Sequence, residues 1–178
     1  MKLATIVRHY ISTHRGLKQA ELDWFRRQPS LEAAIKVAAR AENEKGLRYS
    51  HQYRITRKAM QEAERLLLEN YDYLQKCKSF HELWQLIRKV LGAVTGLGEL
   101  YIYDTALRIG AYLNLLPERV YLHAGTRTGA KAFGITSRHT EWVDVDELPA
   151  PLNELPPHEV EDILCIYKGE TIPVKGCK

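Results

Sequence analysis

The chain has 178 residues, 45% of them hydrophobic and 27% charged, which is typical of globular proteins and argues against a disordered or fibrous chain. No stretch approaches the roughly 18 consecutive apolar residues of a membrane-spanning helix, and the N-terminus lacks a signal-peptide pattern. The net charge of +4 is compatible with nucleic acid as a partner without requiring it. We therefore expect one cytoplasmic domain over residues 1–178, with no membrane segment.

Apolar residues at spacings of three and four, together with helix end signals, predict helices along most of the chain. Ser30 is expected to cap a helix, Ser79 to begin a capping box with Glu82, and Gly46 to end a helix in the left-handed conformation. In chain order, the predicted helices cover about residues 3–13, 16–27, 31–45, 56–70, 71–76, 80–91, 99–113, 124–133 and 159–167.

The spacing of apolar residues typical of helices ends at about residue 136. Alternating residues from Glu141 to Val145 predict a short extended piece, and four prolines before the last helix predict a loop. The final residues, 175–178, are expected to fray. The predicted fold class is therefore all-α, mainly helical, with a short irregular or extended C-terminal segment over about 136–178.

The most informative segment is the pair of predicted helices that flank Gly96-Leu97-Gly98, a unit of about residues 79–113. Two glycines allow a tight turn and bring backbone amides to the surface. The start of the second helix adds amides without intrahelical partners and a partial positive charge. Such a turn can hold a phosphate without side-chain chemistry.

These residues resemble the helix-hairpin-helix superfamily, and in particular the helical core of base-excision DNA glycosylases. The family's hairpin reads hydrophobic, an optional proline, then Gly-hydrophobic-Gly, and here the segment is Val94-Thr95-Gly96-Leu97-Gly98. The family's return segment after the second helix is similar to Val120–Arg127. The resemblance spans about residues 80–133 and implies an orthogonal helical fold with DNA as partner.

Three residues depart from the family's pattern. The resemblance places a reactive lysine near Leu100 and a catalytic aspartate near His123, so neither group is matched. Glu99 puts a negative charge at the helix start, where it favours the helix dipole but would repel a phosphate. The hairpin thus predicts architecture and DNA contact better than it predicts catalysis.

Other polar residues form a candidate site. Asp104 and Arg108 stand one helical turn apart, which is typical of a structural ion pair; alternatively, Asp104 lines a pocket with His123 and acts as a base. The candidate catalytic residues are therefore Asp104 and His123. The candidate pocket residues are Tyr101, Tyr103, Arg108, Tyr121, His51 and Arg54, whose tyrosines could stack on an extruded base or could simply belong to the core.

Nucleic-acid contacts are expected from the hairpin and from nearby positive charges, which could alternatively form an ordinary solvated face. The candidate residues are Gly96, Leu97, Gly98, Arg88, Lys89, Arg127 and Lys131. Cys77, Cys165 and Cys177 are odd in number and form no CxxC motif, so their spacing predicts neither disulfides nor a zinc cluster. We expect no metal and no cofactor.

Three hypotheses for the function follow. The first is a DNA-binding protein with a glycosylase-like helix-hairpin-helix fold. The second is a monofunctional glycosylase-like enzyme that acts on a modified base. The third is a helical interaction or accessory protein that binds a protein partner and no nucleic acid.

Overall fold

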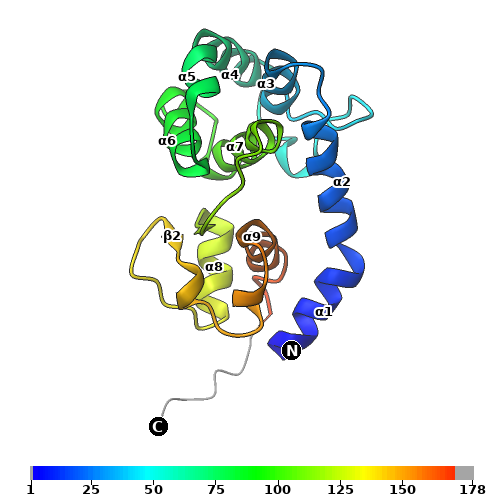
Figure 1. Cartoon of the computed structure of the whole chain (residues 1–178), viewed down its shortest axis with the longest axis vertical. Helices are drawn as coiled ribbons and strands as arrows, with labels where there is room; N and C mark the ends of the chain where they lie inside the picture. Colours follow the sequence, from blue (N-terminus) through cyan, green and yellow to red (C-terminus); the bar gives the residue numbers. More distant parts are fainter. Residues whose placement is uncertain (1, 171–178) are drawn as a thin grey trace. The chain divides into compact units, whose positions relative to one another are not determined.

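The computed structural model describes residues 2–170, which form nine α-helices, three short 3₁₀ turns and one two-stranded sheet (Figure 1). The protein is therefore mainly helical, as the sequence predicts. Within these residues, no helix combines the length and the apolar character needed to cross a bilayer. The fraying predicted for residues 175–178 lies outside the described residues.

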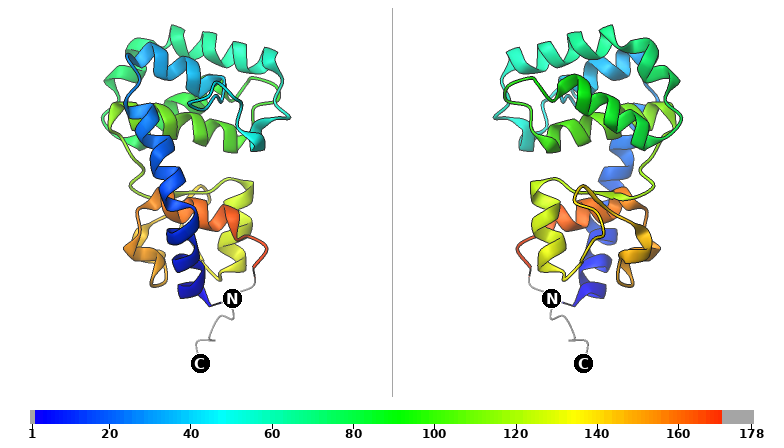
Figure 2. Two further views of the ribbon diagram at one scale, coloured as in Figure 1. Left: turned by 90° about the vertical axis from the view of Figure 1, so that its right-hand side faces the viewer. Right: turned by 90° about the vertical axis from the view of Figure 1, so that its left-hand side faces the viewer.

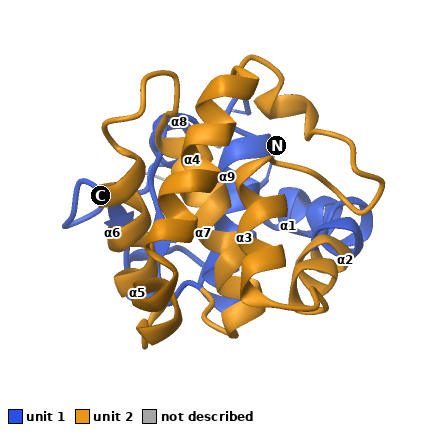
Figure 3. Ribbon diagram, turned by 90° about the horizontal axis from the view of Figure 1, so that it is seen from above, with its two compact units in different colours: residues 1–18, 117–178 blue, residues 19–116 orange. Residues whose placement is uncertain are grey.

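The chain divides into two compact units, drawn in different colours in Figure 3. Unit 1 combines residues 1–18 with residues 117–178, and unit 2 consists of residues 19–116. The single domain predicted over residues 1–178 is not tested by this division and stays a prediction.

Unit 2 is a helical bundle in which α7 packs against both α3 and α6 (Figure 2). Side chains on all sides of α7 are buried, which makes it the central helix of the unit. The bundle contains the end of α2 (Arg15–Arg26), α3 (Leu31–Ala39), α4 (Arg57–Glu69), α5 (Tyr71–Lys76), α6 (Phe80–Leu91) and α7 (Glu99–Leu113).

Side-chain caps begin three of these helices. Ser30 Oγ accepts from the amide of Ala33, and Thr56 Oγ1 accepts from that of Ala59. Ser79 caps α6 by accepting from the amide of Glu82, as predicted, but the predicted capping box is incomplete, because the Glu82 carboxylate accepts from the amide of Lys78 instead of that of Ser79. Each cap binds one of the amides that lack an intrahelical acceptor in the first turn.

The predicted end of the third helix is wrong. α3 ends at Ala39, before Gly46, and the first residue with positive φ is Ala41, at 52°. Gly46 does have positive φ, 67°, but it belongs to a later turn in which its amide donates to the carbonyl of Asn43. The sequence shows the left-handed glycine but not which turn contains it.

Unit 1 is built around the packing of α8 against α9, with α1 also contacting α9. Ile6 and Tyr10 of α1 are fully buried in the same apolar core as Val160 and Ile163 of α9. The elements are α1 (Leu3–Thr13), β1 (Val120–Tyr121), α8 (Ala124–Ala132), β2 (Trp142–Val143) and α9 (Pro157–Ile166).

The C-terminal part of unit 1 contains the predicted extended piece. β1 and β2 pair antiparallel, with Val120 opposite Val143. Two 3₁₀ turns, at Val145–Glu147 and Leu152–Glu154, fill the proline-rich segment before α9. This segment is therefore irregular but ordered by backbone hydrogen bonds, as its turn residues lead one to expect.

The glycines of the α6–α7 turn give a prediction about stability. Gly96 has a φ of 92°, whereas Gly98 has a φ of −97°, and a Cβ at either position would meet no atom within 4 Å. We expect Gly96→Ser to lower the free energy of unfolding by about 1 kcal/mol, because a side chain strains the positive-φ backbone.

The same substitution at Gly98 is the matched control. Because Gly98 is the N-cap of α7, Gly98→Ser should leave stability unchanged or raise it by a few tenths of a kcal/mol. Urea unfolding followed by circular dichroism compares the two variants. Equal losses of stability would contradict the backbone argument.

Candidate functional site

The α6–α7 hairpin presents glycines and backbone at the surface. Leu97 is only 9% exposed and anchors the turn, whereas Gly96, Gly98 and Glu99 are exposed. The amide of Leu97 donates to the carbonyl of Val94 at 3.2 Å. Gly98 has no side chain with which to cap α7, so the start of this helix is an exposed N-terminus without a side-chain cap.

Two of the predicted basic residues, Arg88 and Lys89, lie in the last turn of α6, directly before this hairpin turn. Both are exposed. The guanidinium of Arg88 lies over the ring of Trp84, 5.0 Å from its centroid. Stacking of this kind holds the arginine side chain against the surface of the helix.

Asp104 of α7 is held by the segment that precedes α4. Its Oδ2 atom accepts hydrogen bonds from His51 Nε2 at 2.9 Å and from Gln52 Nε2 at 2.5 Å. The predicted partner on the same helix, Arg108, is more distant, with Nη2 at 3.9 Å from Asp104 Oδ2. The helical spacing therefore identified one neighbour of Asp104, but the closest partners come from the loop.

Arg108 is the buried centre of this cluster, with an exposed fraction of 3%. Its guanidinium donates to Glu21 Oε1 and to Gln52 Oε1, each at 3.3 Å. It also lies 4.1 Å from the ring centroid of Tyr49. These contacts join α2, the loop and α7, which is the arrangement expected of a structural charge network.

The tyrosines predicted for the pocket are core residues. Tyr101 and Tyr103 are 2% exposed in unit 2, and Tyr121 is 1% exposed in β1 of unit 1. The hydroxyl of Tyr101 donates to the carbonyl of Ala39, and burial raises its pKa. We therefore do not assign these rings to a stacking surface for bases.

Arg54, the remaining pocket candidate, is exposed in unit 2. Its Nε atom donates to the hydroxyl of the neighbouring Tyr53 at 2.9 Å, and its guanidinium lies over the same ring. These contacts are local to the loop. They show no direct contact with Asp104.

His123 is the N-cap residue of α8 and is 3% exposed. Its backbone amide donates to Thr126 Oγ1 at 2.7 Å, which fixes the start of the helix. Its Nε2 atom lies 2.5 Å from Oε1 of Glu161, a residue of α9 that is 5% exposed. Its Nδ1 atom accepts from the amide of Gly125 at 3.2 Å.

The two residues predicted to be catalytic thus belong to different units, Asp104 to unit 2 and His123 to unit 1. Each is bound by side chains of its own unit. Because these contacts do not place the two residues in one pocket, we build no joint chemistry from them.

The other predicted basic residues lie in unit 1. Arg127 and Lys131 are exposed on α8 and line an open groove of about 410 Å³ together with Ser137 and His139. Arg127 Nη1 donates to the carbonyl of Leu122 at 2.8 Å. The groove thus contains two basic side chains, and their predicted contact with nucleic acid stays a prediction.

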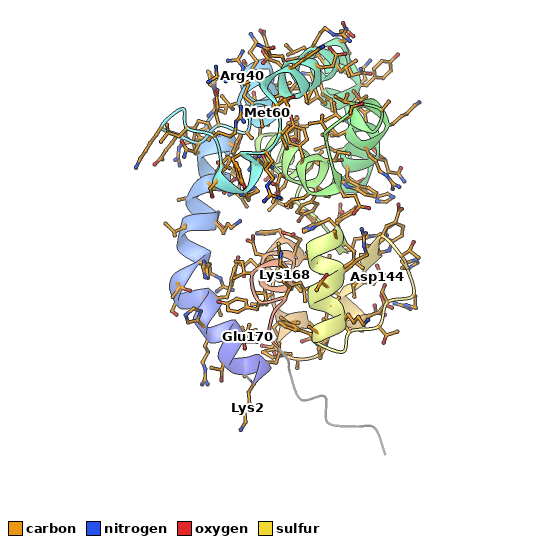
Figure 4. All side chains as sticks on the ribbon, turned by 180° about the vertical axis from the view of Figure 1, so that it is seen from behind. Lys2, Arg40, Met60, Asp144, Lys168 and Glu170 are labelled. Atoms are coloured by element: carbon orange, nitrogen blue, oxygen red, sulfur yellow. The ribbon has the colours of Figure 1, made fainter. Side chains whose placement is uncertain are left out.

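Sequence reasoning missed two members of these clusters, Glu21 and Glu161, and the pairing of Gln52 with Asp104. These residues belong to no motif and are far from their partners in the sequence. It also missed a groove of about 470 Å³ in unit 2, lined by Arg40 and Met60, which are labelled in Figure 4. Arg40 is engaged there by Glu64 through two hydrogen bonds.

Comparisons with known proteins give no relative for this chain: no family model, no curated protein and no solved structure matches it. The resemblance to helix-hairpin-helix proteins therefore rests on the hairpin residues and on the similarity of the return segment Val120–Arg127.

Proposed function

We propose that this protein binds DNA through the α6–α7 hairpin, with the phosphate backbone as the recognised group. The observation that carries the proposal is the exposed, uncapped N-terminus of α7 next to a positive-φ glycine. The amides of a first helical turn lack intrahelical acceptors, and the helix dipole favours an anion there. Arg88 and Lys89 add two positive charges immediately before the turn.

This geometry favours contact with phosphates over base recognition. A turn of small residues such as Gly96 and Gly98 brings backbone amides close to a ligand, but carries no side chain that distinguishes base edges. We therefore propose binding with little sequence preference. Glu99 weakens this binding, because it places a carboxylate beside the amides that would hold the phosphate.

The proposal makes opposite predictions for two adjacent residues. Gly98→Asp supplies a capping carboxylate to α7, so it should preserve stability while lowering DNA affinity about tenfold. Glu99→Gln removes a repulsive charge and should raise affinity about two- to fivefold. Fluorescence anisotropy with a short labelled duplex measures both, and wild-type affinity should fall linearly on logarithmic axes with added salt.

Gly16→Asp is the matched control for Gly98→Asp. Gly16 is an exposed glycine in the first turn of α2, where an added Cβ would meet no atom within 4 Å, and its replacement changes the net charge equally. It should leave DNA affinity unchanged within about twofold, because its charge is not at the hairpin. The proposal would be overturned if DNA affinity did not depend on salt concentration, or if Gly98→Asp and Gly16→Asp changed it equally.

The other hypotheses have their own tests. The enzyme hypothesis requires that Asp104→Asn or His123→Ala abolish base release from DNA without unfolding the chain. We do not propose it, because Asp104 and His123 belong to different units and each side chain is bound within its own unit. The accessory-protein hypothesis predicts a stable complex with a protein partner that survives charge reversal of Arg88 and Lys89.

A further inference from the structure

We propose that unit 1 contains a site for a transition-metal ion, best matched to Zn²⁺, formed by His123, Glu161 and Cys165. An imidazole nitrogen, a carboxylate oxygen and the thiol sulfur of these residues all lie within 4.8 Å of one another. Zinc binds these three kinds of donor at about 2.0–2.3 Å, which places neighbouring ligands of a tetrahedral site roughly 3.3–3.8 Å apart. Movements of about an ångström therefore complete the site.

Local structure fixes the three side chains in this arrangement. Glu161 and Cys165 are four residues apart on α9, so they lie on the same face of the helix. His123 is fixed by its place at the N-cap of α8. α8 and α9 approach so closely at Gly129 that a Cβ there would lie 2.0 Å from the carbonyl oxygen of Leu164.

A second glycine leaves space beside the donors. A Cβ on Gly125 would lie 3.1 Å from Cε1 of His123 and 3.3 Å from Sγ of Cys165. Because Gly125 has no side chain, the imidazole of His123 and the thiol of Cys165 can both lie close to its Cα. Cys165 is only half-buried, which gives an ion a route to the two more deeply buried donors.

Binding of a cation rearranges the hydrogen bonds of His123. Because Nδ1 of His123 accepts from the amide of Gly125, we assign the ring proton to Nε2, which donates to the carboxylate of Glu161. A metal ion at Nε2 replaces this proton, which moves to Nδ1. Nδ1 then no longer accepts from the Gly125 amide, so metal binding costs that hydrogen bond.

Charge balance favours a divalent ion. The thiol of Cys165 loses its proton to solvent when its sulfur bonds the metal, and the carboxylate of Glu161 keeps its negative charge. With a neutral imidazole, two negative ligands then balance the two positive charges of Zn²⁺. The ion thereby compensates a carboxylate that is 5% exposed, a position where unbalanced charge is costly.

The donor set selects the kind of metal. A thiolate and an imidazole suit zinc and other borderline or soft ions, whereas Ca²⁺ and Mg²⁺ prefer oxygen ligands. Three protein ligands leave a fourth position of a tetrahedral site for water or another small ligand. The proposal is independent of DNA binding, which we assign to a hairpin in unit 2.

The test uses the full chain after treatment with a chelator, titrated with Zn²⁺ alone in competition with a chromophoric chelator. We expect stoichiometric binding, a higher melting temperature and release of one proton per ion. Cys165→Ser and Glu161→Gln should each weaken binding about 100-fold or more, because each removes or weakens a ligand. Co²⁺ provides a second signal, a thiolate-to-metal absorption band that should be lost in Cys165→Ser.

Cys77→Ser is the matched control, since Cys77 is also a half-buried cysteine outside any disulfide but lies in unit 2. It should bind Zn²⁺ and show the Co²⁺ band as the wild type does. Circular dichroism checks that each variant is folded. The proposal is overturned if wild type binds no Zn²⁺, or if Cys165→Ser and Glu161→Gln, while folded, bind it as tightly as Cys77→Ser does.

Discussion

Gly129→Ala is expected to destabilise the protein by about 3 kcal/mol or more. The added Cβ would lie 2.0, 2.7 and 2.9 Å from the carbonyl oxygen, carbonyl carbon and Cα of Leu164. These are backbone atoms of α9, so no side-chain rotation can remove the overlap. α8 and α9 would have to separate, which opens the core of unit 1.

Alanine stabilises a helix by about 1 kcal/mol relative to glycine, so helix propensity alone would make Gly129→Ala stabilising. A loss of stability therefore reports the overlap with α9. Gly16→Ala is the matched control: Gly16 lies in α2, and its Cβ would meet nothing within 4 Å. It should raise stability by about 0.5–1 kcal/mol. Urea unfolding followed by circular dichroism measures both variants. A Gly129→Ala variant as stable as wild type would show that the two helices are not in close contact.

Local sequence signals predicted the helices of this protein well. The limits of α1 and α7 agree with the predicted ranges, and Ser30 and Ser79 cap the helices that they were expected to begin. Such signals work because a cap or a periodic apolar face depends on residues within one or two turns. Gly46 shows the limit, since positive φ occurs in many kinds of turn.

Local sequence signals could not predict which polar side chains contact one another. Glu161 is 38 residues from His123, and Gln52 is 52 residues from Asp104. Only the packing of distant elements brings such pairs together. Cys165 illustrates the same point: it belongs to no CxxC motif, yet the approach of α8 to α9 places its sulfur near an imidazole and a carboxylate.

The division into units had no sequence signal either. One boundary, between Lys18 and Gln19, lies within α2, and the other lies between Leu116 and Pro117. A boundary within a helix needs no glycine- or proline-rich linker, so composition does not change there. The N-terminal residues contribute to unit 1 through apolar contacts with α9 that arise only in the folded chain.

Arg108→Met is expected to cost about 2–3 kcal/mol of stability. The substitution keeps an apolar stem of similar length, but removes the charge that binds Glu21 and the hydrogen bond to Gln52 Oε1. It also removes the contact of the guanidinium with the ring of Tyr49. We place the loss below the largest values for buried ion pairs because the Glu21 side chain is 22% exposed and therefore partly solvated.

Arg65→Met is the matched control, which removes an arginine charge from an exposed position. Arg65 also has two acidic partners, Glu62 and Glu69, but its side chain is 52% exposed. We expect no measurable change in stability there, since exposed ion pairs gain little over solvated charges. Urea unfolding of both variants tests this difference. If Arg108→Met were as harmless as Arg65→Met, the cluster around Asp104 would not stabilise unit 2, and its polar residues would have to be explained by ligand binding. A large loss confined to Arg108→Met assigns Asp104, Gln52 and Arg108 to the structural network that holds the loop against α7.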